Sequence, residues 1–481
     1  MSSVADSVAS LGGSFRDPAG FVFLLRGRVH RQVNKAGQAD FDFFTASGLY
    51  AKLAAEGLIV THEEVKPSSL PADPKRYKVL KPAVIPFVSY PYEWGFSQHK
   101  AAALLTLQIQ KIALAHGMIL KDASAYNVQF FGRRPLFIDS LSFRIYKPGA
   151  PWDGYKQFCE HFVAPLAVAS YGYMEVFKTL RAYLDGLPLA AAARLLPAKA
   201  RLRRGLATHI FLHAASARRY DSAKQSSART RPMSRLAMDG LLASLEKTVQ
   251  KLQAPKQITQ WGDYYADTNY SDAAFKAKLQ IVEAMLDQIS PKPRVVWDLG
   301  ANDGRFSELA ARRASYTISI ESDPRAIELN FTKPRDPLIA DLILPLKQDL
   351  ANPSPALGWA HVERHSLQER GPTDAVLALA LLHHLVIGNN LPFLAIAEFF
   401  ARISRTAIVE FIPKSDSNAQ ILMRRRRNMF EDYSQANFEN DFSRYFKILQ
   451  KAPIRDSQRT LYLLKAKAHL HTDGPKTAQP E

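Results

Sequence analysis

The stretch from Val295 to Ser307 constrains the fold of this 481-residue chain most strongly. It reads V-V-W-D-L-G-A-N-D-G-R-F-S, in which a short apolar run ends at Asp298 and glycines follow at Gly300 and Gly304. An amphipathic helix pattern then begins, so the order predicts a strand, a glycine-bearing turn and a helix. In an open α/β sheet a nucleotide-like cofactor binds at such a turn, because glycines let the backbone approach the ligand and leave N–H groups free.

The length and the cysteine content limit the class of protein. A chain of 481 residues is too long for one ordinary core, so we expect two or three domains. The lone Cys159 excludes an internal disulfide framework and a Cys-rich zinc site, and it fits a reducing compartment. The N-terminus lacks the pattern of a signal peptide, and no apolar run reaches the ~18–20 residues that span a bilayer. We therefore expect a soluble, cytoplasmic protein.

The net charge of +18 is unevenly distributed. Between Arg194 and Arg235 there are eleven Lys and Arg residues against a single acid, Asp221. Two interpretations stay open: solvated helix faces with a linker, or a patch that binds a polyanion. Nucleic acid is one such polyanion, but no RNP, helix-turn-helix or zinc-finger signature supports it.

Changes of pattern along the chain predict five segments. A disordered N-terminus (1–19) precedes an α+β accessory domain (20–170) and a basic helical connector (171–255), and an α/β domain (256–467) precedes a disordered tail (468–481). In the α/β domain, strand patterns alternate with helical ones, which indicates a doubly wound sheet with an antiparallel finish. The predicted strands are Val295–Trp297, Thr317–Ile320, Leu346–Gln348, Ala375–Ala380, Ala407–Phe411, Phe446–Leu449 and Thr460–Lys465. The third is placed directly after Pro345, because proline suits only the start of a strand.

Acidic residues follow the next two strands. Glu321 comes about 20 residues after the glycine turn, where a carboxylate accepts hydrogen bonds from ribose hydroxyls. Asp349 and Leu350 follow the third strand and are placed to meet an adenine edge. Asn302 occupies a turn position that often carries another glycine, and asparagine tolerates positive φ better than most residues.

This succession resembles the class I S-adenosylmethionine-dependent methyltransferases. The likeness is carried by D-L-G-A-N-D-G at 298–304, I-E-S-D-P at 320–324, Q-D-L at 348–350, A-L-L-H-H-L at 380–385 and V-E-F at 409–411, and it covers roughly residues 260–467. It implies a seven-stranded Rossmann-like sheet whose last strand is inserted antiparallel. The cofactor-binding residues it implies are Asp298 at the amino-acid end, Gly300, Asn302 and Gly304 around the methionine moiety, Glu321 at the ribose, and Asp349 and Leu350 at the adenine. A dinucleotide-binding fold is the rival, but it would more typically use G-x-G-x-x-G, which the turn lacks.

Three residues are candidates for catalysis. His383 and His384 end the fourth strand, where open α/β sheets place their ligands, and histidine is well tuned as a base near neutral pH. Glu410, one strand over, is the third. The family's Asn-Pro-Pro-Tyr element for exocyclic amines is absent, which favours O- or N-methylation of a small-molecule or glycan-like acceptor, with the basic charge pointing to an anionic one. Some similar proteins are grouped with nodulation-type methyltransferases, which suggests a saccharide or a lipid-saccharide.

A second constellation lies in the accessory domain. Asp122 and Asn127 form D-x-x-x-x-N after a long helical pattern, and Asp139 ends a strand pattern further on. This resembles the loops of protein-kinase-like folds, which implies Asp122 as base and Asn127 and Asp139 as magnesium ligands for Mg–ATP. Lys121 and Ser140 depart from the family's pattern. A degenerate fold, an active kinase or nucleotide binder, and a chance pattern all stay open.

The preferred hypothesis is therefore a two-domain methyltransferase acting on an unidentified acceptor. The first alternative is a bifunctional protein whose kinase-like domain binds nucleotide or transfers phosphate. The second is a non-catalytic protein that binds a cofactor or a polyanion.

Overall fold

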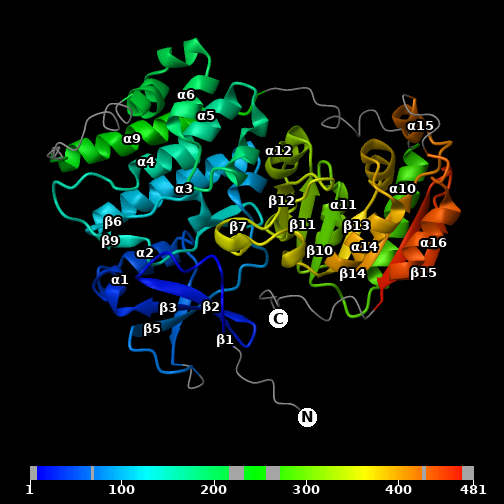
Figure 1. The fold of residues 1–481 in the computed structure, drawn as a ribbon, viewed down its shortest axis with the longest axis horizontal. Coiled ribbons are helices and arrows are strands. Elements are labelled where there is room, and N and C mark those ends of the chain that lie inside the picture. The colour runs from blue at the N-terminus through cyan, green and yellow to red at the C-terminus, as the bar shows by residue number, and fades with distance from the viewer. Residues whose placement is uncertain (1–7, 67–69, 216–231, 256–270, 425–429, 468–481) are drawn as a thin grey trace. The chain divides into compact units, whose positions relative to one another are not determined.

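The structure is a computed structural model that describes residues 8–66, 70–215, 232–255, 271–424 and 430–467. The described chain forms two compact units (Figure 1). The first contains the described residues up to 255 together with Leu357–Arg364, and the second contains the rest. The predicted disordered tail (468–481) and the first seven residues lie outside the described residues, and the predicted domain boundaries stay predictions.

A seven-stranded sheet forms the centre of the second unit, in the order β12-β11-β10-β13-β14-β16-β15. The first five of these strands are parallel, while β16 pairs antiparallel with both β14 and β15. This confirms the predicted seven-stranded α/β sheet with an antiparallel finish. The strands are β10 (Val295–Leu299), β11 (Tyr316–Glu321), β12 (Ile343–Lys347), β13 (Thr373–Ala378), β14 (Ser404–Phe411), β15 (Phe446–Pro453) and β16 (Thr460–Ala466). The chain runs from β10 outward to β12 and then returns to the other side of β10, so a crevice opens at the carboxyl ends of β10 and β13.

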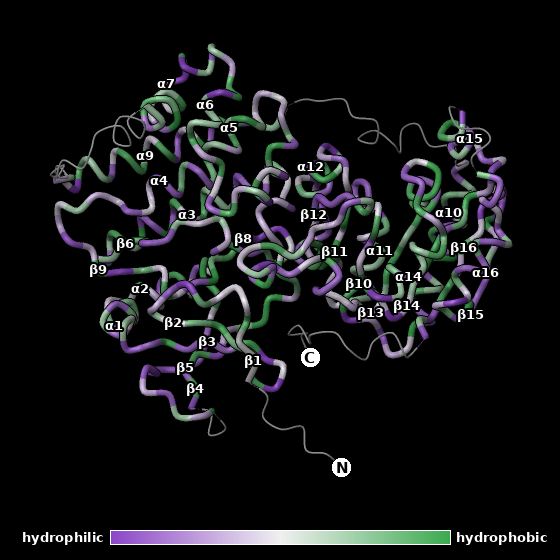
Figure 2. The backbone as a smooth tube through the Cα atoms, in the orientation of Figure 1, coloured by the Kyte–Doolittle hydropathy of each residue, from purple (hydrophilic) through white to green (hydrophobic). Residues whose placement is uncertain are grey.

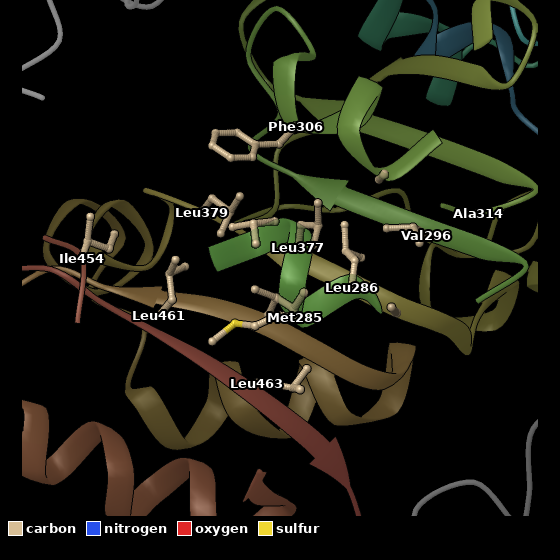
Figure 3. Packing of buried hydrophobic residues seen from close by; sticks show 14 of the residues in the cluster. Met285, Leu286, Val296, Phe306, Ala314, Leu377, Leu379, Ile454, Leu461 and Leu463 are labelled. Carbon is tan, nitrogen blue, oxygen red and sulfur yellow. The ribbon is translucent and has the colours of Figure 1, made fainter. Parts of the chain in front are cut away.

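Helices cover both faces of this sheet. On one face, Met285 and Leu286 of α10 pack with Val296 and Leu377 of the sheet (Figure 3). On the other face, Phe411 of β14 stacks with aromatic residues around α14 and α16. Successive strand residues point to opposite faces, so the nearly continuous apolar runs of these strands serve two cores. The helices are α10 (Asp272–Asp287), α11 (Arg305–Ala311), α12 (Pro324–Thr332), α13 (Pro337–Ala340), α14 (Phe393–Ile403), α15 (Ser417–Met423) and α16 (Gln435–Tyr445).

The prediction for the third strand is wrong at its start. Strand β12 begins at Ile343 and contains Pro345, which pairs in register with Ser319. Because β12 is the edge of the sheet, one side of its backbone has no neighbouring strand, and a missing N–H is tolerated there.

The first unit opens with a five-stranded antiparallel sheet in the order β1-β2-β3-β5-β4. Its hairpin turns at Arg26 and Gly27, both with positive φ, as two-residue hairpin loops require. Strand β1 pairs with β2, which differs from the prediction that residues 1–19 are disordered. The strands are β1 (Val8–Ser10), β2 (Gly20–Leu25), β3 (Arg28–Asn34), β4 (His62–Val65) and β5 (Arg76–Pro82), with helices α1 (Gln38–Ala46) and α2 (Leu49–Ala55) between β3 and β4.

Helices and two short two-stranded sheets complete the first unit. The long helix α3 (Phe96–Ala115) is capped by His116, and Gly117 follows with a φ of 72°, which fits the residue after a helix C-cap. The paired strands that follow are β6 (Met118–Leu120) with β9 (Phe143–Ile145), and β7 (Val128–Phe131) with β8 (Arg134–Phe137). The later helices include α4 (Tyr155–Phe158), α5 (Ala164–Ser170), α6 (Leu189–Leu195), α7 (Arg204–Leu206) and α9 (Arg235–Lys251). The kinase-like assignment and the helical connector stay predictions. Among the described residues, no helix combines the length and the apolar character needed to cross a bilayer.

Candidate cofactor site

The turn after β10 has the backbone conformation that its residues predict. Gly300, Asn302 and Gly304 have φ values of 75°, 49° and 84°. A Cβ atom at Gly304 would lie 2.7 Å from the amide of Asn330, so this glycine is required for packing under the turn. The N–H groups of Gly300 and Ala301 donate to the carbonyl of Ile320, at 2.9 and 3.0 Å, and fasten the turn to β11.

A cavity opens at the carboxyl ends of β10, β11 and β13 and gathers most of the predicted cofactor residues. Its lining includes Asp298, Gly300, Asn302, Glu321, Asp349, Leu350 and His384. Gly304, His383 and Glu410 are not among the residues that line it. Lys278, Phe275, Phe306, Gln348 and residues 379–381 complete much of the wall. The cavity wall therefore combines carboxylates with apolar side chains, which suits an elongated ligand that carries polar groups at intervals.

The carboxylate of Glu321 joins the turn to the loop that follows β11. One oxygen accepts the N–H of Asn302 at 3.0 Å, and the other accepts the N–H groups of Ser322 and Asp323 at 2.6 and 3.0 Å. The residue is only 9% exposed, and burial raises the pKa of its carboxyl, while the three N–H donors act in the opposite direction. Glu321 therefore shapes the turn in addition to facing the cavity.

Asp298 is a buried acid at the end of the cavity near α11. Its carboxylate accepts the Ser307 hydroxyl at 2.6 Å, and that hydroxyl also lies 2.9 Å from the hydroxyl of Ser319. Burial raises the pKa of Asp298 to about 7, with the charge of Glu321 adding to the effect and the hydrogen bond from Ser307 opposing it. Its charge therefore changes near neutral pH, where a cationic group in the cavity would favour the ionised form.

Asp349 and Leu350 line the cavity directly after β12. One carboxylate oxygen of Asp349 accepts the N–H of Ala351 at 2.9 Å, which fixes the tight turn at this point. The neighbouring Gln348 accepts the N–H of Ser354 at 3.0 Å through its side chain. These hydrogen bonds hold the polar side chains of Asp349 and Gln348 at the cavity wall.

The two candidate histidines are placed differently. His384 lines the cavity, whereas His383 is 1% exposed and lies behind it, with ring centroids 4.0 Å apart. Burial, followed by the charge of Arg459, lowers the pKa of His384 to about 4, and burial also lowers that of His383. Both imidazoles are therefore neutral at pH 7, and only His384 is positioned to meet a ligand.

Glu410 belongs to a buried charge network. Its carboxylate accepts the Lys278 ammonium at 2.7 Å and the N–H of Ala380 at 2.7 Å, and it lies 3.7 Å from the guanidinium of Arg459. Arg459 in turn bonds Asp416 at 2.8 Å. Glu410 is fully buried and Lys278 only 3% exposed, so these charges depend on each other for compensation.

Lys278 is a charged cavity residue that the sequence did not indicate. It lies on α10, and its ammonium is 4.9 Å from the ring centroid of Phe306. A lysine within an amphipathic helix pattern usually belongs to a solvated face. No acid on α10 lies three or four residues from Lys278, where it could form an ion pair with the ammonium. This absence alone is too weak a signal to predict that Lys278 is buried.

In the first unit, hydrogen bonds from Asn127 link the three predicted kinase-like residues, directly to Asp122 and through Ser142 to Asp139. The Asn127 amide donates to the Ser142 hydroxyl at 3.2 Å, and that hydroxyl donates to Asp139 at 2.8 Å. The Asn127 amide also donates to the backbone carbonyl of Asp122 at 3.4 Å, and burial raises the pKa of the Asp122 carboxyl.

Arg31 of β3, which the sequence did not single out, forms an ion pair with Asp139. Burial opposes ionisation of Asp139, but the charge of Arg31 and the hydrogen bond from Ser142 hold the pKa below its usual range. The carboxylate predicted to bind magnesium thus has a protein cation as its partner. Within the described ranges, no group of three or more His, Cys, Asp or Glu residues is arranged to hold a metal ion.

Comparison with known proteins identifies a full-length relative. The nodulation protein NoeA of Rhizobium meliloti (strain 1021) is 35% identical over 459 residues, which cover 94% of this chain and 95% of the relative. No family model matches the chain.

Solved methyltransferase structures are similar to less than half of the chain. Magnesium protoporphyrin IX methyltransferase (ChlM) from Synechocystis PCC 6803, with bound SAH, is 17% identical and covers 43% of this chain and 93% of its own, at a TM-score of 0.30. The N-methyltransferase NodS from Bradyrhizobium japonicum WM9, in complex with S-adenosyl-L-homocysteine, is 12% identical and covers 42% and 91%, also at 0.30. These two proteins are different methyltransferases, and neither likeness decides the activity of this chain.

Proposed function

Because the chain belongs to the family of the nodulation protein NoeA and its second unit has the class I methyltransferase fold, we propose that it transfers a methyl group from S-adenosylmethionine to an acceptor. The observation that carries this proposal is the cavity at the carboxyl ends of β10, β11 and β13. It brings Asp298, Glu321 and Asp349 together along one wall, beside the glycine turn. These acids lie at the ends of β10, β11 and β12, which neighbour one another in that order in the sheet, and this supports assigning them to the amino acid, the ribose and the adenine of the donor.

Each residue would hold one part of the donor. Asp298 would bind the ammonium group of the methionine moiety, and Glu321 the ribose hydroxyls. Asp349 would meet the adenine amino group beside Leu350, and Gly300 and Asn302 would let the backbone approach the ligand closely. When bound, S-adenosylmethionine supplies an electrophilic sulfonium methyl group.

The chain's own contribution would be mainly to align the acceptor and exclude water. His384 lies where it could accept a proton from the acceptor, but its pKa of about 4 makes it a weak base. His383 and Glu410 would then act as positioning residues, since both lie behind the cavity wall. Glu410 fixes the Lys278 ammonium and the N–H of Ala380 at that wall.

We propose a small-molecule or glycan-like acceptor that carries a negative charge, methylated on oxygen or nitrogen in the cytoplasm. The support is the net charge of +18. Extract incubated with the purified chain and methyl-labelled S-adenosylmethionine should yield a labelled compound, detectable by mass spectrometry. If S-adenosylhomocysteine binds but no extract compound gains label, the non-catalytic alternative gains support.

The raised pKa of Asp298 predicts that ligand binding depends on pH. The ammonium of the methionine moiety requires the ionised carboxylate, so affinity for S-adenosylhomocysteine should rise by up to about tenfold per pH unit as pH approaches 7 from below. The free protein should show the opposite trend. Because the folded state favours the protonated acid, the stability from this group is present below its unfolded pKa and is lost as pH rises through about 7.

Calorimetric titrations and urea unfolding between pH 5.5 and 8, about 1.5 units below and 1 unit above that pKa, measure both trends. Asp298→Asn should bind weakly with a flat pH profile. An unchanged slope in this variant would show that another group titrates.

The second candidate function, nucleotide binding by the first unit, rests on Asp122, Asn127 and Asp139. The ion pair between Arg31 and Asp139 argues against it, because a magnesium ion would have to displace the guanidinium from a partly buried carboxylate. We therefore expect no thermal shift with Mg–ATP. A thermal shift with Mg–ATP would instead establish the nucleotide site if it disappears in Asp139→Asn and persists in Asp153→Asn, which changes an exposed acid.

A further inference from the structure

The segment from Arg194 to Leu212 carries a cluster of outward-facing cations in the first unit. Arg194, Lys199, Arg201, Arg203 and Arg204 are all exposed, and the structure gives none of them a carboxylate partner among the described residues. No Asp or Glu occurs in the sequence from Gly186 to Tyr220. Among the residues that the structure describes, this positive charge therefore has no paired carboxylate.

Aliphatic side chains protrude from the same segment. Leu202 is 85% exposed, Leu212 65% and Leu195 46%. The Arg201 guanidinium lies 5.0 Å from the ring centroid of Phe211, so the chain near Leu202 runs close to the chain near Leu212. Hydrophilic and hydrophobic residues alternate along this stretch of the chain, near α6 and α7 (Figure 2).

The segment is anchored, so its outward face is a fixed surface. Ala200, Leu206 and Ile210 are at most 1% exposed and hold the segment against the unit. The charged groups of Lys199 and Arg203 both lie over the Tyr171 ring, at 5.9 and 5.3 Å. The exposed leucines are thus held outward by a packed framework.

We propose that residues 194–212 bind the surface of a bilayer that contains anionic phospholipids. Cations attract acidic headgroups, and aliphatic side chains gain by entering the boundary between headgroups and acyl chains. A nucleic acid would use the cations but would leave Leu202 and Leu212 in water, and single-stranded nucleic acid prefers exposed aromatic platforms. Here the aromatic rings of Tyr171 and Phe211 lie beneath the cations. This inference is independent of the proposed methyl transfer.

Co-sedimentation of the full chain with vesicles tests the proposal. The chain should bind vesicles of phosphatidylcholine mixed with phosphatidylglycerol and should bind pure phosphatidylcholine far more weakly. Arg201→Gln/Arg203→Gln/Arg204→Gln should weaken binding by about a hundredfold, and Leu202→Ser/Leu212→Ser by roughly tenfold. Leu338→Ser is the matched control, because Leu338 is 81% exposed in the second unit, and it should bind like wild type.

Three results would overturn the proposal, provided that circular dichroism shows folded variants. The first is equal binding to both kinds of vesicle. The second is a leucine double variant that binds like wild type. The third is that a single-stranded oligonucleotide competes with the anionic vesicles and that Leu202→Ser/Leu212→Ser leaves the affinity for the oligonucleotide unchanged. This result would identify a nucleic-acid surface.

Discussion

Glu321→Ala is expected to reduce the affinity for S-adenosylhomocysteine by at least about a hundredfold, since hydrogen bonds to a charged group contribute about 1.5–3 kcal/mol. Two effects add. The carboxylate would be lost as a ribose acceptor, and the N–H groups of Asn302, Ser322 and Asp323 would lose the acceptor that joins the turn to the loop after β11. Isothermal titration calorimetry of wild type and variant measures the change.

Two further variants show whether the loss is specific. Glu321→Gln keeps one acceptor oxygen and should fall between wild type and the alanine variant. Glu398→Ala removes an exposed carboxylate that pairs with Arg402 on α14 and should bind like wild type. If folded Glu321→Ala binds S-adenosylhomocysteine as tightly as wild type does, the ligand does not use this wall of the cavity.

Glu410→Ala is expected to lower the free energy of unfolding by about 3–5 kcal/mol, the usual cost of leaving a buried charge without its partner. Glu410 is fully buried, and its removal takes the carboxylate at 2.7 Å from Lys278 and the one at 3.7 Å from Arg459. The N–H of Ala380 also loses its acceptor at the cavity wall. Urea unfolding, followed by circular dichroism, gives the difference.

A double variant separates the charge effect from loss of packing. Lys278→Met/Glu410→Gln removes both members of the pair and should be more stable than Glu410→Ala, because no uncompensated ammonium remains. The exposed pair of Arg402 and Glu398 gives the baseline, with less than about 1 kcal/mol expected for Glu398→Ala. A loss below that baseline for Glu410→Ala would mean that water reaches this network in solution.

The second unit could be predicted well because its signals are local. The sequence from Asp298 to Gly304 requires positive φ at defined positions, and buried parallel strands appear as continuous apolar runs. The position of β12 could not be predicted from Pro345 alone, because the tolerance for proline depends on the strand being an edge. Whether a strand lies at the edge or in the centre is a property of the assembled sheet.

The site was predictable only in part, for a related reason. Residues at strand ends, such as Glu321 and Asp349, are placed by the topology, so spacing along the chain was enough to propose them. Lys278 and Arg31 pair with acids 132 and 108 residues away, and no local pattern reveals a contact of that kind. The difference between His383 and His384 likewise depends on which of two neighbouring side chains faces the cavity.

A crystal structure of the chain with S-adenosylhomocysteine tests the central claim most directly. The account predicts ligand density in the cavity beside the glycine turn, with the adenine next to Asp349 and Leu350, the ribose at Glu321 and the ammonium at Asp298. Density for the ligand at any other place, or an empty cavity in crystals grown with saturating ligand, would contradict it.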